Sequence, residues 1–146
     1  MSRLKWLFVL CGFADRAGQL LIEGGLRMTF RIEIGIDCNE PERLATFWAS
    51  ALGYEVGRFG PDGVYLDLVP PSPSQPVIYF QRVPEPKSAK NRLHLDLWTT
   101  QPEHEISRLV GIGAVKLGTP RESSSGNWWQ VLQDPAGNEF CVCRER

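Results

Sequence analysis

Two stretches of the chain alternate between apolar and polar residues in the way that a strand with one buried face requires. In the first, isoleucines occupy every second position from 32 to 36, and Glu33 stands between them. In the second, leucines occupy every second position from 93 to 97, and His94 stands between them. Each stretch therefore predicts a strand that turns its aliphatic side into a core and leaves Glu33 or His94 on the other side.

An amphipathic helix is predicted directly after each of these strands. The first helix carries apolar residues at helical spacing between 44 and 52, with Pro41 in its first turn and Gly53 at its end. Asn39 and Glu42 before it have the spacing of a capping box. The second helix has the same signals, and the matching residues are Thr100, Pro102, Glu103, Gly111 and Gly113.

Three short strands are predicted after each helix, separated by segments rich in Gly, Pro and Ser. They cover residues 54–58, 64–69 and 77–83 in the first half of the chain, and residues 115–119, 128–133 and 139–144 in the second half. The last two strands are joined by residues 134–137, Asp-Pro-Ala-Gly, which fit a type I turn.

The two halves keep the same spacing along their length. Pro41 precedes Pro102 by the same number of residues as Glu33 precedes His94. We therefore predict a duplication, with βαβββ modules at residues 29–83 and 91–146 in an α+β fold. Half-sheets of this size do not close a core alone, so we expect them to pack side by side with their concave faces around one cavity.

The first 27 residues stand apart from this pattern. Arg3 and Lys5 precede a short apolar run, as in a signal peptide, but no cleavage site of small residues follows. The run is too short and too interrupted to cross a membrane. Because Met28 stands directly before the first strand, we expect one domain at residues 28–146, with residues 1–27 as an extension or a misassigned upstream start.

The composition of the chain excludes some classes of binding partner. The 146 residues carry 16 basic and 17 acidic side chains, a formal net charge of -1, which offers no footprint for nucleic acid or for an anionic membrane. Four cysteines without a CxxC pair are typical of a reducing compartment, so we expect a cytoplasmic protein. The sequence also lacks signatures for acyl transfer, phosphoryl transfer and nicotinamide binding.

Three segments together carry a family resemblance. They are residues 36–53, where IDCNEPERLA leads to FW and ALG, residues 91–97, NRLHLDL, and residues 134–142, DPAGNEFCV. In order and spacing these segments resemble the vicinal oxygen chelate superfamily, and within it the glyoxalase-like domain proteins related to glyoxalase I and bleomycin-resistance proteins. The resemblance covers residues 29–145. It implies the fold of glyoxalase, bleomycin-resistance protein and dihydroxybiphenyl dioxygenase, in which two βαβββ modules form a U-shaped mixed sheet around a small-molecule cavity, and it implies a homodimer.

The resemblance also implies a divalent metal site. Enzymes of the superfamily hold the metal with side chains from the first and last strand of each module. The matching positions in this sequence are Glu33 and Gln81, or Tyr79 if the register shifts, together with His94 and Cys141. Only His94 is of the residue type that the superfamily usually has at its position. Cys141 stands where a glutamate is expected. Such a set suits Zn, Fe, Ni or Mn, and a thiolate shifts the preference toward zinc.

The residues leave two chemical alternatives open. With a metal, Glu33 and His94 are the expected catalytic pair, since the ion would stabilise an enediolate while a carboxylate moved the proton. Without a metal, Glu33 and His94 would hydrogen-bond each other or a ligand in the cavity. The residues expected to bind the ligand are Tyr79, Gln81, Asp96, Trp98 and Trp129.

Three functions follow from these alternatives. The protein binds a small organic molecule between its modules, with catalysis left open; or it is a metal-dependent lyase, isomerase or dioxygenase. As a third function, it sequesters a drug or metabolite in the manner of a bleomycin-resistance protein. The incomplete ligand set favours the interpretations without a metal, and the scaffold alone does not decide, because one fold hosts many activities.

Overall fold

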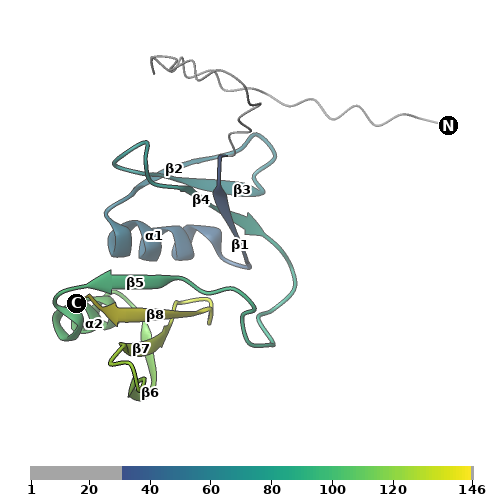
Figure 1. Cartoon of the computed structure of the whole chain (residues 1–146). Coiled ribbons are helices and arrows are strands. Elements are labelled where there is room, and N and C mark those ends of the chain that lie inside the picture. Colours follow the sequence, from purple (N-terminus) through teal and green to yellow (C-terminus); the bar gives the residue numbers. More distant parts are fainter. Residues whose placement is uncertain (1–30, 146) are drawn as a thin grey trace, which may run out of the picture. The chain divides into compact units, whose positions relative to one another are not determined.

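The computed structural model describes residues 31–145 and confirms the two βαβββ modules (Figure 1). Module one contains β1 (Glu33–Cys38), α1 (Pro41–Leu52), β2 (Glu55–Phe59), β3 (Tyr65–Val69) and β4 (Val77–Arg82). Module two contains β5 (Asp96–Thr99), α2 (Pro102–Gly111), β6 (Val115–Glu122), β7 (Trp128–Gln133) and β8 (Glu139–Arg144). Neither helix of this part of the chain is long and apolar enough to span a bilayer. The expected boundary at Met28 and the extension of residues 1–27 lie outside the described residues.

Each module forms one four-stranded mixed sheet. The strand order is β1-β4-β3-β2 in module one and β5-β8-β7-β6 in module two. In both sheets the first strand runs parallel to the last, and the other neighbours are antiparallel. This repeat of order and direction confirms the α+β fold class and its duplicated modules.

The strands β2, β3 and β4 differ from the predicted bounds by one residue at one end or at both, and two other strands differ by more. β5 begins only at Asp96, later than the alternating pattern, because its ladder with β8 starts at the pair of Asp96 and Cys141. β6 continues to Glu122 and does not end at position 119, because a register shift in this edge strand absorbs Pro120. The strands β7 and β8 have the predicted bounds.

Both helices begin at their prolines, as predicted, but the two capping boxes are wrong. No side-chain hydrogen bond caps the N-terminus of either helix. The amide of Asn39 instead donates to the backbone oxygens of Val83 and Glu85, at 2.7 and 3.2 Å, so it ties the start of α1 to the linker that follows β4. The predicted end of α1 is confirmed, since Gly53 takes a φ of 70° at the C-cap.

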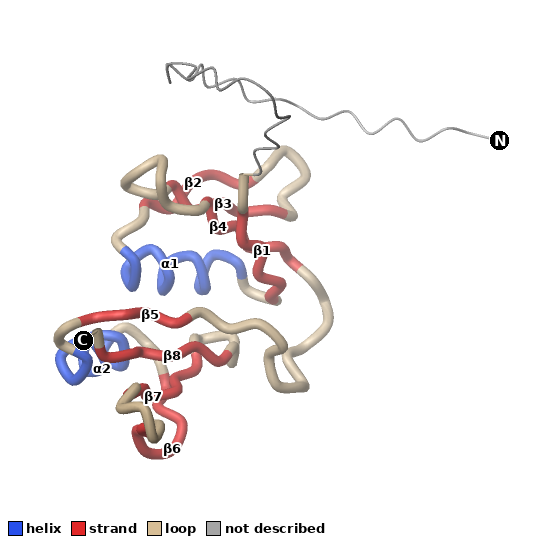
Figure 2. Tube along the Cα trace, viewed as in Figure 1, coloured by secondary structure: helices blue, strands red, loops and turns tan. Residues whose placement is uncertain are grey.

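Helix α1 lies between the two sheets (Figure 2). One side of it packs on β3 and β4 of its own module. On another side, the ring of Trp48 meets Phe140 of β8 at a centroid distance of 5.1 Å and an angle of 61°. Trp48 Nε1 donates to the carboxylate of Asp134 at 3.1 Å. The aliphatic sides of both sheets therefore share one core around α1, in which Trp48 is 2% exposed.

This packing places the polar faces of the two sheets on the outside. Glu33 and Asp37 of β1 are exposed, and so are His94 and Asp96 of module two. We expected Glu33 to meet His94 across one cavity, but in the described chain Glu33 pairs with Arg31, and His94 lies 3.3 Å from Asp96. Helix α1 packs between the aliphatic sides of the two sheets, so the faces that carry Glu33 and His94 point away from it.

Candidate functional site

A cleft of about 830 Å³ opens between the modules. Its walls are β1 and the start of α1 on one side, and the segment before β5 and the β7–β8 turn on the other. Aliphatic side chains of Ile34, Ile36 and Leu95 line it together with the polar groups of Tyr79 and His94. Charged residues also line it, namely Asp37, Glu40, Arg43, Glu85, Lys87, Arg92, Asp134 and Glu139. The cleft thus combines an aliphatic surface with polar and charged groups from both modules.

Glu139 at the start of β8 holds the linker that forms part of the cleft wall. Its carboxylate accepts a hydrogen bond from the backbone N–H of Asn91 at 3.0 Å and pairs with the Lys87 ammonium at 3.2 Å. These contacts lower the pKa of Glu139 to about 2, and the bond from Asn91 is the largest cause. Glu139 is therefore ionised at neutral pH, and its carboxylate fixes the linker in the cleft wall through these two contacts.

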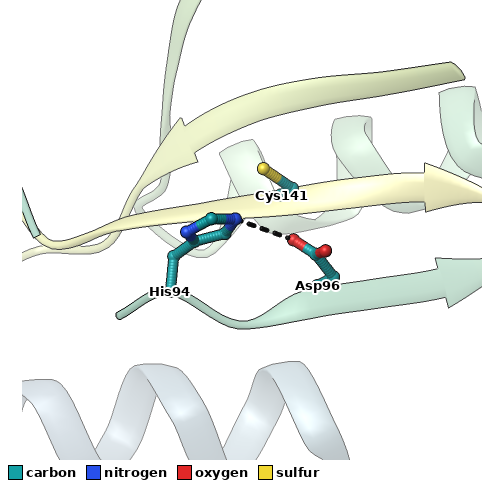
Figure 3. A group of neighbouring side chains, drawn as sticks. All are labelled: His94, Asp96 and Cys141. Carbon is teal, nitrogen blue, oxygen red and sulfur yellow. Dashed lines mark ion pairs between the residues drawn. The ribbon is translucent and has the colours of Figure 1, made fainter. Parts of the chain in front are cut away.

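His94, Asp96 and Cys141 gather on the outer face of the module two sheet (Figure 3). Their nitrogen, oxygen and sulfur atoms all lie within 4.8 Å of one another. Asp96 and Cys141 are partners in the β5–β8 ladder, so their side chains share a face, and His94 stands two residues before Asp96 on that same face. Because His94 also lines the cleft, the cluster lies at the edge of the cleft.

The thiol of Cys141 is held in its protonated form. Burial, the charge of Asp96 and a hydrogen bond from the thiol to that carboxylate raise the pKa of Cys141 to about 12, with burial the largest cause. A protonated thiol is a poor nucleophile. The cluster therefore offers donor atoms for a metal or a hydrogen-bonded ligand, and it does not offer a ready nucleophile.

In module one the corresponding face carries an aromatic pair. The β1–β4 ladder pairs Gly35 with Tyr79, at the place where the β5–β8 ladder pairs Asp96 with Cys141. Tyr79 lies over Gly35, where an added Cβ atom would come within 2.5 Å of the Tyr79 hydroxyl oxygen. Tyr65 packs edge-on against Tyr79, with the ring centroids 5.9 Å apart. An exposed aromatic surface therefore stands where module two has its cluster.

A carboxylate lies beside this aromatic pair. Asp67 of β3 is opposite Tyr79 in the ladder. Its pKa is raised by burial and, to a smaller extent, by the charge of Glu33. Neither Asp67 nor Tyr65 is among the residues predicted from the sequence, although the alternation along β3 places both on the exposed face.

The structure does not bring the two expected metal ligands of module one together. Glu33 stands opposite Val77 at one end of the β1–β4 ladder, and Gln81 stands opposite Asp37 near the other end. Tyr79 holds the position that matches Cys141 of module two. The set that the resemblance implies therefore does not converge in the described chain.

Two tryptophans share the outer face of module two with the cluster. Trp98 and Trp129 both pair with Cys143, so the three side chains point to the same side of the sheet. Trp98 is 56% exposed, whereas Trp129 is half-buried. Trp128 points to the other side, where the Arg144 guanidinium lies 4.7 Å from its ring centroid.

Comparison with known proteins places this geometry in context. The sequence matches the family of glyoxalase-like domains over residues 33–143. No curated protein matches it at a significant level. A member of the glyoxalase/bleomycin resistance protein/dioxygenase superfamily from Sphaerobacter thermophilus has a TM-score of 0.62 at 19% identity, over 82% of this chain and 100% of that chain.

Two further solved structures are similar at the level of the fold. A glyoxalase/bleomycin resistance protein/dioxygenase family enzyme from Burkholderia phytofirmans has a TM-score of 0.60 at 18% identity, over 77% of this chain and 95% of that chain. A lactoylglutathione lyase from Agrobacterium tumefaciens has a TM-score of 0.56 at 14% identity, over 81% of this chain and 95% of that chain. At these identities the likeness shows the fold alone.

Proposed function

Because the chain belongs to the family of glyoxalase-like domain proteins, we propose that it binds a small organic molecule in the cleft between its modules. The observation that carries this proposal is the cleft itself. Its volume of about 830 Å³ falls within the range of roughly 300–1,000 Å³ that is typical of small-molecule sites. Tyr79 from module one and His94 from module two both line it, so a molecule bound there would contact both modules.

The lining indicates the chemistry of the ligand. His94 and Tyr79 can each donate or accept a hydrogen bond, which suits carbonyl and hydroxyl oxygens. Ile34, Ile36 and Leu95 offer an aliphatic surface for the rest of the molecule. Dicarbonyl thiol adducts and catechols combine these two features, so we propose them as the first ligand classes.

A thermal-shift screen with these two classes tests the proposal, because a bound ligand raises the melting temperature with its concentration relative to its dissociation constant. The affinity of any hit is then measured by calorimetry for His94→Ala and His104→Ala. His104 is the other histidine of the chain and is exposed on α2. We expect about a tenfold loss of affinity for His94→Ala, equivalent to one hydrogen bond, and none for His104→Ala. Equal losses in the two variants would contradict a site in the cleft.

The metal-dependent lyase, isomerase or dioxygenase has weaker support. Glu33 and Gln81 stand toward opposite ends of the β1–β4 ladder, and α1 lies between their sheet and the sheet of Cys141. This donor set therefore does not fit one ion in the described part of the chain.

A sequestering function is favoured by one specific observation. The edge-on pair of Tyr65 and Tyr79 stands beside the carboxylates of Asp67 and Glu33 on an exposed sheet face. Aromatic faces and carboxylates both attract organic cations. A cationic aromatic drug and a neutral analogue of the same shape test this function. We expect Asp67→Asn to weaken binding of the cation about tenfold and to leave the neutral analogue unchanged; equal binding of both molecules to the unmodified protein would count against sequestration.

A homodimer is our proposal for the assembly. The outer faces of the sheets expose large apolar side chains, with Val69 50%, Trp98 56% and Val115 57% exposed. A second copy of the chain that packed on one of these faces would remove the exposed apolar side chains of that face from water. Light scattering in solution is expected to give twice the mass of the chain, and Trp98→Glu is expected to lower it. A monomer at all concentrations would contradict this assembly.

We propose the cytoplasm as the location. The cysteines of the described part of the chain are buried free thiols, which are typical of a reducing compartment. Cell fractionation with an antibody to the native protein tests this location, and recovery from an extracytoplasmic fraction would contradict it.

A further inference from the structure

We propose that the free edge of β5, with the groove beside it, binds an extended peptide segment in which a basic residue follows an apolar one. β5 lies at one end of the strand order of module two, so within the described chain it has a neighbouring strand on one side only. The β5 groove, of about 400 Å³, lies between β5, α2 and the C-terminal end of α1. It shares no lining residue with the cleft, so the inference goes beyond the proposed function.

The backbone of β5 carries hydrogen-bonding groups at this edge. The backbone oxygens of Leu95 and Thr99 accept hydrogen bonds from β8 and from the residue after it, at 2.9 and 2.8 Å. Successive backbone groups of a strand point alternately to its two sides, so those of Asp96 and Trp98 point away from β8. An extended peptide offers matching donors and acceptors along its own backbone.

Two of the other edge strands carry protection that β5 lacks. Native proteins commonly protect an edge strand with bulges or prolines. The ladders of β2 and β6 each contain a register shift, and β6 also carries Pro120. The ladder of β5 with β8 is uninterrupted, and β5 contains no proline. The edge of β5 is therefore suited to the addition of a strand.

The β5 groove can take an apolar side chain of the peptide. Leu97 lines it and is half-buried, and Leu109 and Val142 beneath the sheet surface are each 1% exposed. Leu52 at the end of α1 lines it as well. In an added strand, the side chain opposite Leu97 would lie on the same side of the sheet and so point into the groove.

The charges at the groove favour a basic residue in the peptide. Two acidic residues line it, Asp96 and Glu105, against one basic residue, Arg108. Arg108 is already engaged, since it pairs with Glu105 at 2.8 Å and donates to two backbone oxygens at the end of α1. The carboxylate of Asp96, 3.3 Å from His94, is 43% exposed. A lysine or arginine opposite Asp96 would therefore meet an accessible carboxylate.

These features set the order of residues in the peptide. Antiparallel pairing is slightly the more stable arrangement, and it places successive peptide residues opposite Trp98, Leu97 and Asp96. Trp98 is 56% exposed and offers an aromatic ring to the first of them. The groove takes the second residue, and Asp96 faces the third. The expected order is therefore aromatic, aliphatic and basic.

The probe is the peptide Thr-Phe-Leu-Lys-Thr, blocked at both ends and added to the full chain. Binding is followed by NMR. Hydrogen exchange at the backbone amides of Asp96 and Trp98 is expected to slow when the peptide binds, whereas the amides of Leu97 and Thr99, which face β8, change little. A peptide with Glu in place of Lys is expected to bind about fivefold more weakly.

Methylation of single peptide amides distinguishes strand addition from simple apolar contact. Residues opposite Asp96 and Trp98 form hydrogen-bonded pairs with them, so the amides of the peptide's Lys and Phe face β5 and that of its Leu faces away. Methylation of the Lys or the Phe amide is expected to weaken binding about tenfold. Methylation of the Leu amide is expected to leave the affinity nearly unchanged.

Two matched variants test the position of the site. Asp96→Lys is expected to remove the preference for the Lys peptide over the Glu peptide. Glu55→Lys changes an exposed carboxylate on the edge strand β2 and is expected to keep that preference. Melting curves show whether each variant folds, and the methylated peptides decide the question on the unmodified protein if Asp96→Lys does not.

Three results would overturn the proposal. The first is no binding of the probe at millimolar concentration, and the second is an equal effect of methylation at all three amides. The third is slow exchange at Asp96 and Trp98 without peptide in a sample with the mass of a dimer, which would assign the edge to a second copy of the chain. Since no small organic ligand is present, failure here leaves the proposal for the cleft standing.

Discussion

Module one and module two follow the same order of elements, yet their helices pack differently. α1 lies between the two sheets and buries residues on more than one side, Leu44 and Trp48 among them. The buried residues of α2 are Pro102, Ile106 and Leu109, which pack it on β5 and β8 of its own module. The duplicated pattern therefore produces one shared core and not two, because one helix serves both sheets.

The outer faces of the modules differ as well. At matching ladder positions, module one has Gly35 with Tyr79, and module two has Asp96 with Cys141. The first pair presents an aromatic surface, whereas the second presents donor atoms next to His94. The strand ladder therefore sets the position of a functional side chain, while the residue type at that position sets its chemistry.

The largest expected effect comes from the helix that the modules share. Trp48→Ala removes a side chain that is 2% exposed and packs against Phe140, so we expect the free energy of unfolding to fall by about 3–5 kcal/mol in denaturant titrations. Val110→Ala on α2, where the side chain is 42% exposed, is the matched control and is expected to change stability by about 0.5 kcal/mol or less. Similar losses of unfolding free energy for Trp48→Ala and Val110→Ala would contradict the role of α1 as the helix that both sheets share.

The next effect tests the turn that joins module two to α1. Asp134, which is 3% exposed, accepts hydrogen bonds from Trp48 Nε1 and from the backbone N–H groups of Ala136 and Asn138. Asp134→Ala leaves these donors without a partner, and we expect a loss of about 2–3 kcal/mol in the same assay. Asp62→Ala, in an exposed turn of module one, is expected to cost less, and an equal cost would contradict this assignment.

A pH series sharpens the comparison, because Glu139 of module two occupies a place where module one has Val77. The pKa of Glu139 is about 2 in the folded protein, below its ordinary value of 4.5, so the unfolded state binds the proton more readily. Its contribution to stability is therefore complete above about pH 5 and is lost as the pH falls toward 2. In Glu139→Gln the melting temperature is expected to depend less on pH over this range. An unchanged pH dependence would contradict a stabilising role of the ionised Glu139.

The smallest expected effect concerns Arg108 of α2. In the described chain, it is the side chain of α2 that forms hydrogen bonds with α1. Arg108 donates to the backbone oxygens of Ser50 and Ala51, at 2.9 and 2.8 Å, at the C-terminal end of α1. Arg108→Ala is expected to cost about 1 kcal/mol of stability. Arg43→Ala, whose guanidinium pairs with Glu40 in an exposed position, is expected to cost about half as much or less.

Much of the fold can be predicted from local sequence patterns. The alternation around Ile34 and Leu95 predicts the first strands, and the prolines at 41 and 102 mark the helix starts. These signals are local, since strand faces repeat every two residues and helix faces every 3.6 residues. The first capping box is absent because the side-chain amide of Asn39 instead holds the linker after β4.

Less of the candidate site can be predicted from the sequence. Tyr79 and Gln81 lie on the same face of β4, so periodicity alone does not choose between them. Only the ladder shows that Tyr79 matches Cys141. Asp96 is predicted from the sequence as a ligand-binding residue, and its contact with Cys141 appears only once β5 and β8 are in register.

The sequence by itself determined the two modules, their order of elements and the membership of each strand face, because these depend on neighbouring residues. Tertiary packing alone sets α1 between the sheets and gathers His94 with Asp96 and Cys141, while Glu33 pairs with Arg31. The physical reason is that burial of Trp48 against the other module joins residues far apart in the chain, and such a contact leaves no periodic trace in the sequence.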